Sequence, residues 1–252
     1  MDNIIGKTLN FKTPSGMNVV IREQNGDDDE IISKMKNATD GSAVNKFIAA
    51  IVMDCNGHRP TYENILKWKV RDKYYVLLKS RIFSIGDNLI FKYKCINNDC
   101  GKETEYEENL NPYDRDFSKP IDETNNDFDY QIQPYETGEA SEIELLLSSG
   151  KKIKYELLNG NSEKMLLAAN KDEISKNTEL IVRSIQWYNE GKWQKLSNFR
   201  IMSPRDMKEI RSHINKHDLP FEAISELKCP YCKNSSKVSL LAQPDFFFPQ
   251  EP

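Results

Sequence analysis

The chain has 252 residues with a formal net charge of −4, a hydrophobic content of 38% and a charged content of 29%. Its length suits one large domain or two small ones, and its acidic balance argues against a protein held on nucleic acid mainly by phosphate neutralisation. The longest apolar run, residues 47–53, is far shorter than the roughly 20 residues of a membrane span, and the N-terminus lacks the pattern of a secretory signal. We therefore expect a soluble, intracellular protein without membrane association.

The first half of the chain predicts a β-hairpin, several helical segments and a second hairpin, in that order. Alternating apolar residues on both sides of a Ser-Gly pair indicate a hairpin at 8–22. Apolar residues that recur at three and four positions indicate helical segments at 28–35 and 43–54, followed by a longer helix at 71–84. Two cysteines within strand-like sequence indicate a hairpin at 88–108.

The second half predicts the same order of elements after a polar, acidic linker at 111–130. Ser203, Pro204 and Asp206 form a strong start signal for the second long helix, with Ser203 as the N-cap. The predicted elements are a hairpin at 142–157, helical segments at 162–174 and 178–188, a helix at 205–217 and a cysteine hairpin at 222–242.

One constant shift relates the two halves of the chain. The shift that carries Cys95 onto Cys229 also places Arg71-Asp72 opposite Arg205-Asp206 and Ser15-Gly16 opposite Ser149-Gly150, without a gap. We therefore predict an α+β fold built from an internally duplicated unit of β-hairpin, helices and a zinc-ribbon-like cysteine hairpin. The predicted limits are 1–110 for the first unit, 111–130 for the linker and 131–252 for the second unit.

Four of the five cysteines form two close pairs, C-x4-C at Cys95 and Cys100 and C-x2-C at Cys229 and Cys232. Two such pairs in turns between short strands are typical of a four-thiolate zinc site. A closed site of this kind has no open coordination position, so we predict about one structural zinc per chain that joins the two halves. A redox C-x-x-C remains an alternative, and Cys55 is interpreted as a buried or half-buried thiol with no chemical role.

The remaining candidates for chemistry have simpler structural explanations. His213 and His217 lie one helical turn apart, but Ile214 stands where the glutamate of an H-E-x-x-H motif would supply a general base. Asp72 and Asp206 recur at helix starts, where carboxylates stabilise exposed backbone N–H groups. The chain contains no phosphate-binding glycine loop and no nucleophile elbow. We therefore predict a non-enzymatic protein with no small-molecule substrate.

Near its end the chain carries three consecutive aromatic residues, Phe246, Phe247 and Phe248, between Pro244 and Pro249. Three adjacent aromatic rings are costly to leave in water. They either pack back on their own domain or bind a partner, and the sequence leaves both alternatives open.

The motifs taken together resemble the baseplate-hub and hub-assembly proteins of contractile-tailed, T-even-like bacteriophages. The resemblance spans about Ser15 to Pro249, and its most specific pieces are "LLKSRIFSIGDNLIFKYKC" (77–95) and "LPFEAISELKCPYCKNSSKVSLLAQPDFFFP" (219–249). The first copy departs from the tighter C-x2-C turn in having C-x4-C. The resemblance implies a structural component of the baseplate hub, or a chaperone-like assembly factor, whose partners are hub, tape-measure or wedge proteins of the tail.

Two other functions stay open at this point. The four-cysteine pattern alone would also fit a nucleic-acid-binding or regulatory zinc-ribbon protein, against which the acidic balance counts. A metal-dependent enzyme that uses His213 and His217 is a further alternative. On the favoured interpretation the protein acts in the host cytoplasm during assembly, and the sequence leaves open whether it then stays in the baseplate of the virion tail or leaves after assembly.

Overall fold

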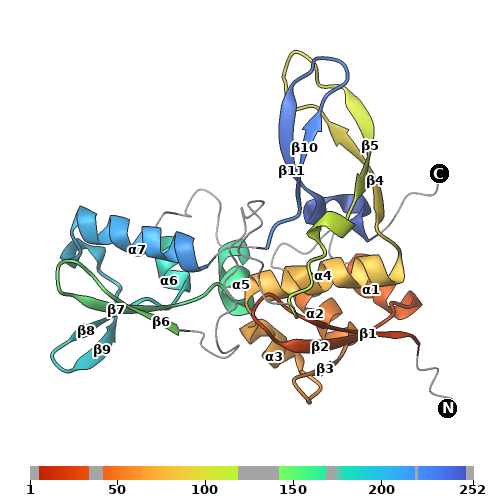
Figure 1. Cartoon of the computed structure of the whole chain (residues 1–252). Helices are drawn as coiled ribbons and strands as arrows, with labels where there is room; N and C mark the ends of the chain where they lie inside the picture. Colours follow the sequence, from red (N-terminus) through yellow and green to blue (C-terminus); the bar gives the residue numbers. More distant parts are fainter. Residues whose placement is uncertain are drawn as a thin grey trace.

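The computed structural model, drawn in Figure 1, describes residues 6–33, 42–118, 142–168, 175, 177–218 and 221–247. The fold is α+β, as predicted, with small antiparallel sheets and short helices. Figure 1 shows one lobe around β1, β2 and β3, a second lobe around β6 to β9, and an arm of two hairpins that projects from the first lobe. No helix in the described ranges is both long and apolar enough to cross a lipid bilayer.

The first lobe combines a three-stranded sheet with four helices. Its strands, in the order β1-β2-β3, are β1 (Thr8–Lys12), β2 (Asn18–Arg22) and β3 (Val52–Cys55). Its helices are α1 (Gly26–Ser33), α2 (Ser42–Ile51), α3 (Tyr62–Lys67) and α4 (Val70–Ser84). The predicted Ser-Gly turn joins β1 to β2, and Gly16 takes a φ of 85°, a conformation that glycine adopts without steric cost.

Helix α4 forms the centre of this lobe. Its side chains are buried around the whole helix rather than on one face, because the sheet packs on one side and the base of the arm covers another. The ring of Tyr75 receives Phe11, Phe117 and Phe221 edge-on, with centroids 4.9 to 5.7 Å away. Burying one large apolar side chain stabilises a fold by about 1.5–3 kcal/mol. This core therefore depends on residues from distant parts of the chain.

The second lobe has its own sheet and its own core. Four strands pair in the order β6-β7-β8-β9, and α6 and α7 accompany them. The bounds are β6 (Glu142–Leu146), β7 (Lys152–Glu156), α6 (Thr178–Val182), β8 (Gln186–Asn189), β9 (Lys192–Lys195) and α7 (Pro204–His217). Ser203 and Asp206 form the predicted capping box at the start of α7, whereas Lys69 makes no side-chain cap at the start of α4. Ile153, Ile185 and Ile210 lie in the core between the sheet and these helices.

Helix α5 (Gly160–Ala168) joins the second lobe to the first, where it lies against α3. The backbone N–H of Val70 donates to the carbonyl of Leu158 at 2.9 Å, and that of Gly160 donates to the carbonyl of Trp68 at 3.1 Å. The ammonium of Lys73, on α4, forms a buried ion pair with the carboxylate of Glu163, on α5. The hydroxyl of Tyr74 donates to the other oxygen of that carboxylate at 2.5 Å.

Sequence reasoning missed this buried contact. Lys73 and Glu163 are charged residues within predicted helical segments, where such residues are usually exposed. Nothing in the sequence around them indicates that they are buried. Only the packing of α5 against α4 shows that both are buried, at 0% and 8% exposure.

Gly160 provides a test of how closely α5 approaches the first lobe. A Cβ atom at this position would lie 3.0 Å from both the Cα and the carbonyl oxygen of Leu66 and 3.2 Å from the Nζ of Lys73. We expect Gly160→Ala to lower the free energy of unfolding by about 1–3 kcal/mol, because backbone atoms cannot move aside as a flexible side chain would. Urea denaturation measures this change.

Gly26→Ala is the matched control. Gly26 holds the corresponding place at the start of α1, and its added Cβ would meet no atom within 4 Å. Because alanine is also the better helix former, we expect no loss of stability or a small gain. Equal destabilisation by both variants would contradict the close contact at Gly160.

The arm consists of two hairpins that come from opposite ends of the sequence. They are β4 (Asn88–Lys94) with β5 (Glu103–Asn109) and β10 (Ile224–Lys228) with β11 (Ser235–Ser239). The Ser225 hydroxyl donates to Glu108 Oε1 at 2.8 Å, and the Tyr113 hydroxyl donates to the carbonyl of Ile224 at 2.8 Å, so the hairpins also contact each other through polar groups. The buried guanidinium of Arg81 donates to the carbonyls of Gly86 and Asn88, which holds the base of the arm to the end of α4.

Several predicted helical boundaries were wrong. The segment predicted as helical at 43–54 ends as a helix at Ile51 and continues as β3, and the segment at 178–188 splits into α6 and β8. Helix α3 and strand β9 were not predicted. Helix α5 ends at Ala168, and residues 169–174 of the segment predicted there lie outside the described residues. The same holds for residues 119–130 of the predicted linker, whereas 111–113 form a short 3-10 helix.

The shift that carries Cys95 onto Cys229 recurs in the element bounds. It relates the first residues of five pairs of elements, namely β1 and β6, β2 and β7, α1 and α5, β3 and β8, and α4 and α7. The two halves therefore keep the same spacing from the first hairpin to the long helix. These bounds agree with a duplication. The duplication and the limits 1–110, 111–130 and 131–252 remain predictions.

Candidate metal centre

All four predicted ligands meet at the end of the arm. The Sγ atoms of Cys95, Cys100, Cys229 and Cys232 lie within 4.8 Å of one another. The Sγ atom of Cys95 is 3.6 Å from that of Cys232, and the Sγ atom of Cys100 is 3.9 Å from that of Cys229. Each hairpin therefore contributes two of the four sulfurs.

The two cysteine turns have similar backbone geometry although their lengths differ. In the first turn the N–H of Cys95 donates to the carbonyl of Lys102 at 2.9 Å, and Gly101 takes a φ of 55°. In the second turn the N–H of Cys229 donates to the carbonyl of Asn234 at 2.9 Å, and Lys233 takes a φ of 63°. The longer C-x4-C turn is thus closed by the same kind of backbone hydrogen bond as the shorter C-x2-C turn.

Backbone N–H groups, burial and the neighbouring sulfurs together shift the pKa values of the clustered thiols. The N–H of Cys232 lowers the pKa of Cys229 to about 7, against the opposing effect of burial. The N–H of Asn97 lowers the pKa of Cys95, but burial and the neighbouring sulfurs raise it more, to about 12. Because a cysteine binds a metal ion as the thiolate, binding an ion here would release protons.

The donor set and its spacing fit a tetrahedral ion. With Zn–S bonds of about 2.3 Å, an ideal tetrahedron places sulfurs about 3.8 Å apart, close to the separations of the two nearest pairs. Four thiolates would leave no open position for water or substrate, so such an ion would stabilise the arm and would not act on a substrate.

Cys55 lies apart from this cluster, in β3. Its Sγ is 4.0 Å from the Sδ of Met17, and burial raises its pKa to about 11. A thiol with a raised pKa forms little thiolate near neutral pH and is a poor nucleophile. The half-buried position agrees with the interpretation of Cys55 from the sequence.

His213 and His217 lie side by side on α7, with ring centroids 4.1 Å apart and their planes tilted by 37°. One ring nitrogen of His213, Nδ1, shares a hydrogen bond of 2.9 Å with the hydroxyl of Tyr155. Within the described residues, no third His, Cys, Asp or Glu side chain joins them in a cluster that could hold a metal ion. The pair therefore packs against the sheet of the second lobe and has no metal-binding set around it in that part of the chain.

Acid is expected to destabilise the second lobe through His213. Burial lowers the pKa of His213, and the nearby His217 lowers it further. Because the unfolded chain then takes up its proton at a higher pH than the folded chain, the free energy of unfolding falls as the pH drops below about 6.5. A thermal denaturation series between pH 8 and pH 5 measures this dependence of stability on pH. The variant His213→Gln should show a weaker dependence, and an unchanged dependence would show that His213 is not its cause.

The two helix-start carboxylates hold their neighbouring hairpin turns. Asp72 Oδ1 accepts the backbone N–H of Ser15 at 2.9 Å. A hydrogen bond from Lys151, with a further one from Ser149, lowers the pKa of Asp206 well below its usual range. Both aspartates are buried, and each ties the Ser-Gly turn of its hairpin to a long helix. Their recurrence therefore has a structural explanation.

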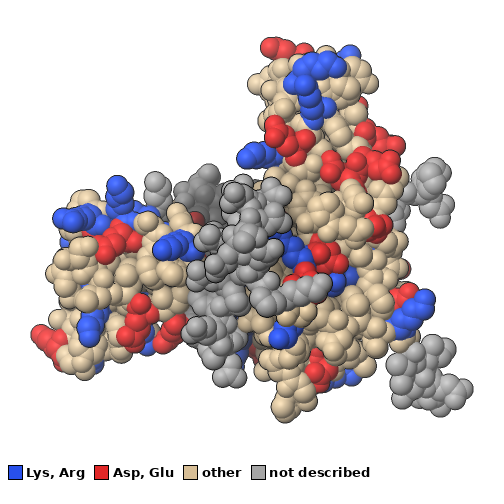
Figure 2. Space-filling model, viewed as in Figure 1, with Lys and Arg blue, Asp and Glu red and all other residues tan. Residues whose placement is uncertain are grey.

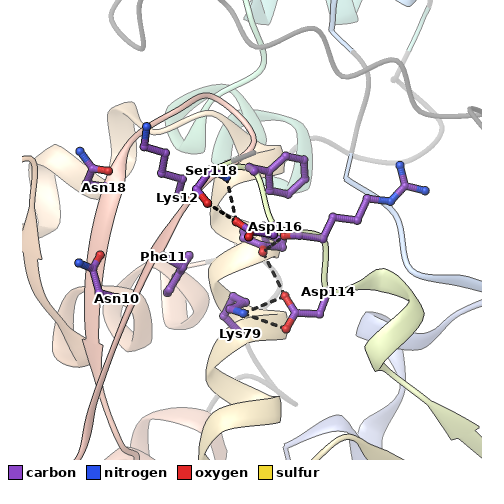
Figure 3. Close-up of a pocket in the computed structure, with 11 residues that line it drawn as sticks. Asn10, Phe11, Lys12, Asn18, Lys79, Asp114, Asp116 and Ser118 are labelled. Atoms are coloured by element: carbon purple, nitrogen blue, oxygen red, sulfur yellow. Dashed lines mark hydrogen bonds and ion pairs between the residues drawn. The ribbon is translucent and has the colours of Figure 1, made fainter. Parts of the chain in front are cut away.

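A surface depression of about 520 Å³ lies between β1, α4 and residues 114–118 (Figure 3). Lys79 forms an ion pair with Asp114 at 2.8 Å, and the hydroxyl of Tyr75 donates to the same carboxylate at 3.1 Å. These contacts fasten residues 114–118 to α4. The depression is shallow and polar, and the Lys79–Asp114 ion pair lies within its lining. These charged groups therefore have a structural explanation and do not indicate a ligand site.

The aromatic residues near the end of the chain lie against the first lobe. Phe246 is 1% exposed, and the ring of Phe247 meets that of Phe47 edge-on with centroids 5.3 Å apart. Phe248 lies outside the described residues. Of the two alternatives, this arrangement favours packing on the chain itself for Phe246 and Phe247. Binding of a partner through the three residues stays an untested prediction.

The comparisons with known proteins agree with the resemblance seen in the motifs. No curated protein and no solved structure matches the chain. A family model described as "T4 bacteriophage base plate protein" matches residues 6–135, which include the whole first lobe and the first cysteine hairpin and amount to just over half of the chain. The chain belongs to this T4-like phage baseplate protein family.

Proposed function

We propose that the protein is a non-enzymatic component or assembly factor of the baseplate hub, which binds other tail proteins and is stabilised by a structural zinc ion. Family membership supports the baseplate role. The single observation that supports the structural role is the cluster of four cysteine sulfurs, two from each hairpin, at the end of the arm. Hub, tape-measure and wedge proteins are the proposed partners, with assembly in the host cytoplasm.

Zinc is the ion we propose, at about one per chain. Four thiolate ligands favour zinc over magnesium and calcium, which take oxygen ligands. Because the sulfurs come from residues 95–100 and 229–232, the ion would join segments that are far apart in the chain. Elemental analysis of freshly purified protein should find about one zinc per chain, and a metal-free protein would contradict the proposal.

We further propose that the chain arose by duplication of one unit. The common shift of five pairs of elements supports it, as do the left-handed glycines at equivalent turns, Gly16 with a φ of 85° and Gly150 with a φ of 82°. In this proposal the two copies diverged at their cysteine turns. They diverged also at α2, which has ten residues against five in α6.

A genetic test addresses the baseplate role directly. The gene for this chain is inactivated in the phage that encodes it, and the protein is supplied from a plasmid in the host. We expect particles made without the protein to lack complete baseplates in electron micrographs, and the plasmid to restore them. Complete baseplates in the absence of the protein would overturn the proposed function.

A further inference from the structure

The end of the arm exposes apolar surface on a rigid support. Ile96 is 63% exposed and Tyr231 is 57% exposed, and each stands next to one of the clustered cysteines, Cys95 and Cys232. Both turns are closed by the backbone hydrogen bonds described above. Exposed large apolar groups on a protruding, ordered element are typical of a protein contact site rather than of an ordinary surface.

Tyr231 is held in place from one side. The ammonium of Lys102 lies 4.3 Å from the centroid of its ring, which is a cation–π contact. A tyrosine that is already ordered loses little conformational freedom when a partner covers it. Tyrosine is also among the residues enriched at the energetic centres of protein interfaces.

Charge is distributed unevenly along the arm. Lys and Arg side chains cover much of its end, where acidic side chains are few, whereas Asp and Glu side chains lie along its lower part (Figure 2). The exposed cations at the end are Lys94, Lys102, Lys228 and Lys233, which outnumber the exposed carboxylate of Asp99 in the same turns. The exposed carboxylates below them include Glu105, Glu107, Glu222 and Glu226. A partner that approaches the end of the arm therefore meets positive charge around an apolar centre.

From this arrangement we infer that the arm tip, defined here as residues 94–102 and 228–234, is a docking surface for a tail protein with an acidic surface around an apolar pocket. The pocket would take the ring of Tyr231, and carboxylates around it would pair with Lys102 and Lys233. The inference rests on the proposed function, and it adds where the contact lies and what chemistry recognises it.

A protein fits this surface better than a nucleic acid. A duplex or a single strand carries phosphates along its length, and the carboxylates on β5 and β10 would repel them just below the tip. A compact acidic patch on a partner protein would contact only the arm tip and would avoid these carboxylates. Charge complementarity of this kind increases the rate and the specificity of association more than its final strength.

Photocrosslinking during infection tests the inference. p-Benzoylphenylalanine is placed at position 231 of the plasmid-borne protein, in the phage that lacks its own copy of the gene. We expect ultraviolet light to join the protein to one tail protein, identified by mass spectrometry. The control places the same probe at position 188, on the second lobe, where Tyr188 is 44% exposed.

Charge reversal supplies the second measurement. Lys102→Glu combined with Lys233→Glu should lower the yield of that crosslink about tenfold or more, because a patch matched to acidic groups then repels them. Tyr231→Phe should restore baseplates as well as the wild-type chain does, whereas Tyr231→Ala should restore about tenfold fewer. Zinc content and thermal stability must match the wild type in every variant. If Tyr231→Ala fails this check, Tyr231→Ser takes its place.

The possible outcomes separate the two proposals. A crosslink only to nucleic acid, only to a second copy of this chain, equally at position 188, or to nothing at all overturns the docking surface. So does full baseplate assembly by Tyr231→Ala and by the charge-reversed variant. If assembly nevertheless requires the gene, the proposed function stands without the docking surface. If baseplates form without the gene, the proposed function itself is wrong.

Discussion

Replacing Cys95 and Cys229 together by serine is expected to abolish zinc binding and to lower the free energy of unfolding by about 4 kcal/mol or more. A ligand that binds only the folded chain stabilises it by about 4 kcal/mol when its free concentration is a thousand times its Kd. One sulfur is lost from each hairpin, so neither half of the site remains complete. The core beneath the arm should then loosen, because Leu227, Val238 and Phe246 belong to the same buried cluster as α4.

Cys55→Ser is the matched control for this variant. Cys55 lies in β3, away from the cluster, and its removal should leave the zinc content at its wild-type value. Elemental analysis gives the zinc content and chemical denaturation gives the stability. Wild-type stability of the double variant would show that the cysteines do not hold a structural ion.

Replacing Lys73 by methionine is expected to lower the free energy of unfolding by about 3–5 kcal/mol. The change leaves the carboxylate of Glu163 buried against α4 without its counter-ion, and an uncompensated buried charge is strongly destabilising. The hydroxyl of Tyr74 remains as its partner but carries no charge. Urea denaturation measures the change.

The double variant Lys73→Met with Glu163→Gln should recover most of the loss. Glutamine keeps an oxygen that can accept the hydrogen bond from Tyr74 and carries no charge, so the desolvation penalty disappears with the ion pair. If the double variant is as unstable as Lys73→Met alone, the ion pair is not the cause. A purely additive result would likewise show that the two residues do not interact.

Local patterns predicted the parts of the fold that depend on local chemistry. The Ser-Gly hairpins, the capping box at Ser203 and the cysteine turns each have a short sequence signal, and each is present in the structure. The four clustered cysteines could be named as candidate metal ligands because close cysteine pairs are rare in ordinary chains and their spacing is specific.

Strands β3 and β8 were missed because tertiary pairing decides their conformation. Val52 to Cys55 continue the apolar spacing of α2, but they pair with β2, where Val52 faces Ile21 and Cys55 faces Val19. The turns that follow hold a usable signal: Asn56-Gly57 and Glu190-Gly191 both take positive φ angles, as tight hairpins require. Weighting these pairs above the helical spacing would have placed both strands.

The contact of α5 with the first lobe had no such signal. It depends on Gly160, whose small size permits close approach, and on a buried ion pair, and neither is distinguishable in sequence from a helix start and solvated charges. For the same reason the packing of Phe246 on the first lobe could not be decided. An aromatic tail satisfies the same pattern whether its own chain or another chain covers it.

The composition of the first core has a consequence for the order in which the chain can fold. This core contains Met17 and Val19 near one end of the sequence and Phe221, Leu227 and Phe246 near the other. A ribosome makes the chain from its N-terminus, so the last side chains that cover α4 are added only when synthesis reaches Phe246. Chains released early would keep apolar surface exposed and would be open to proteolysis. Only chains synthesised at least as far as Phe246 could then bury this surface.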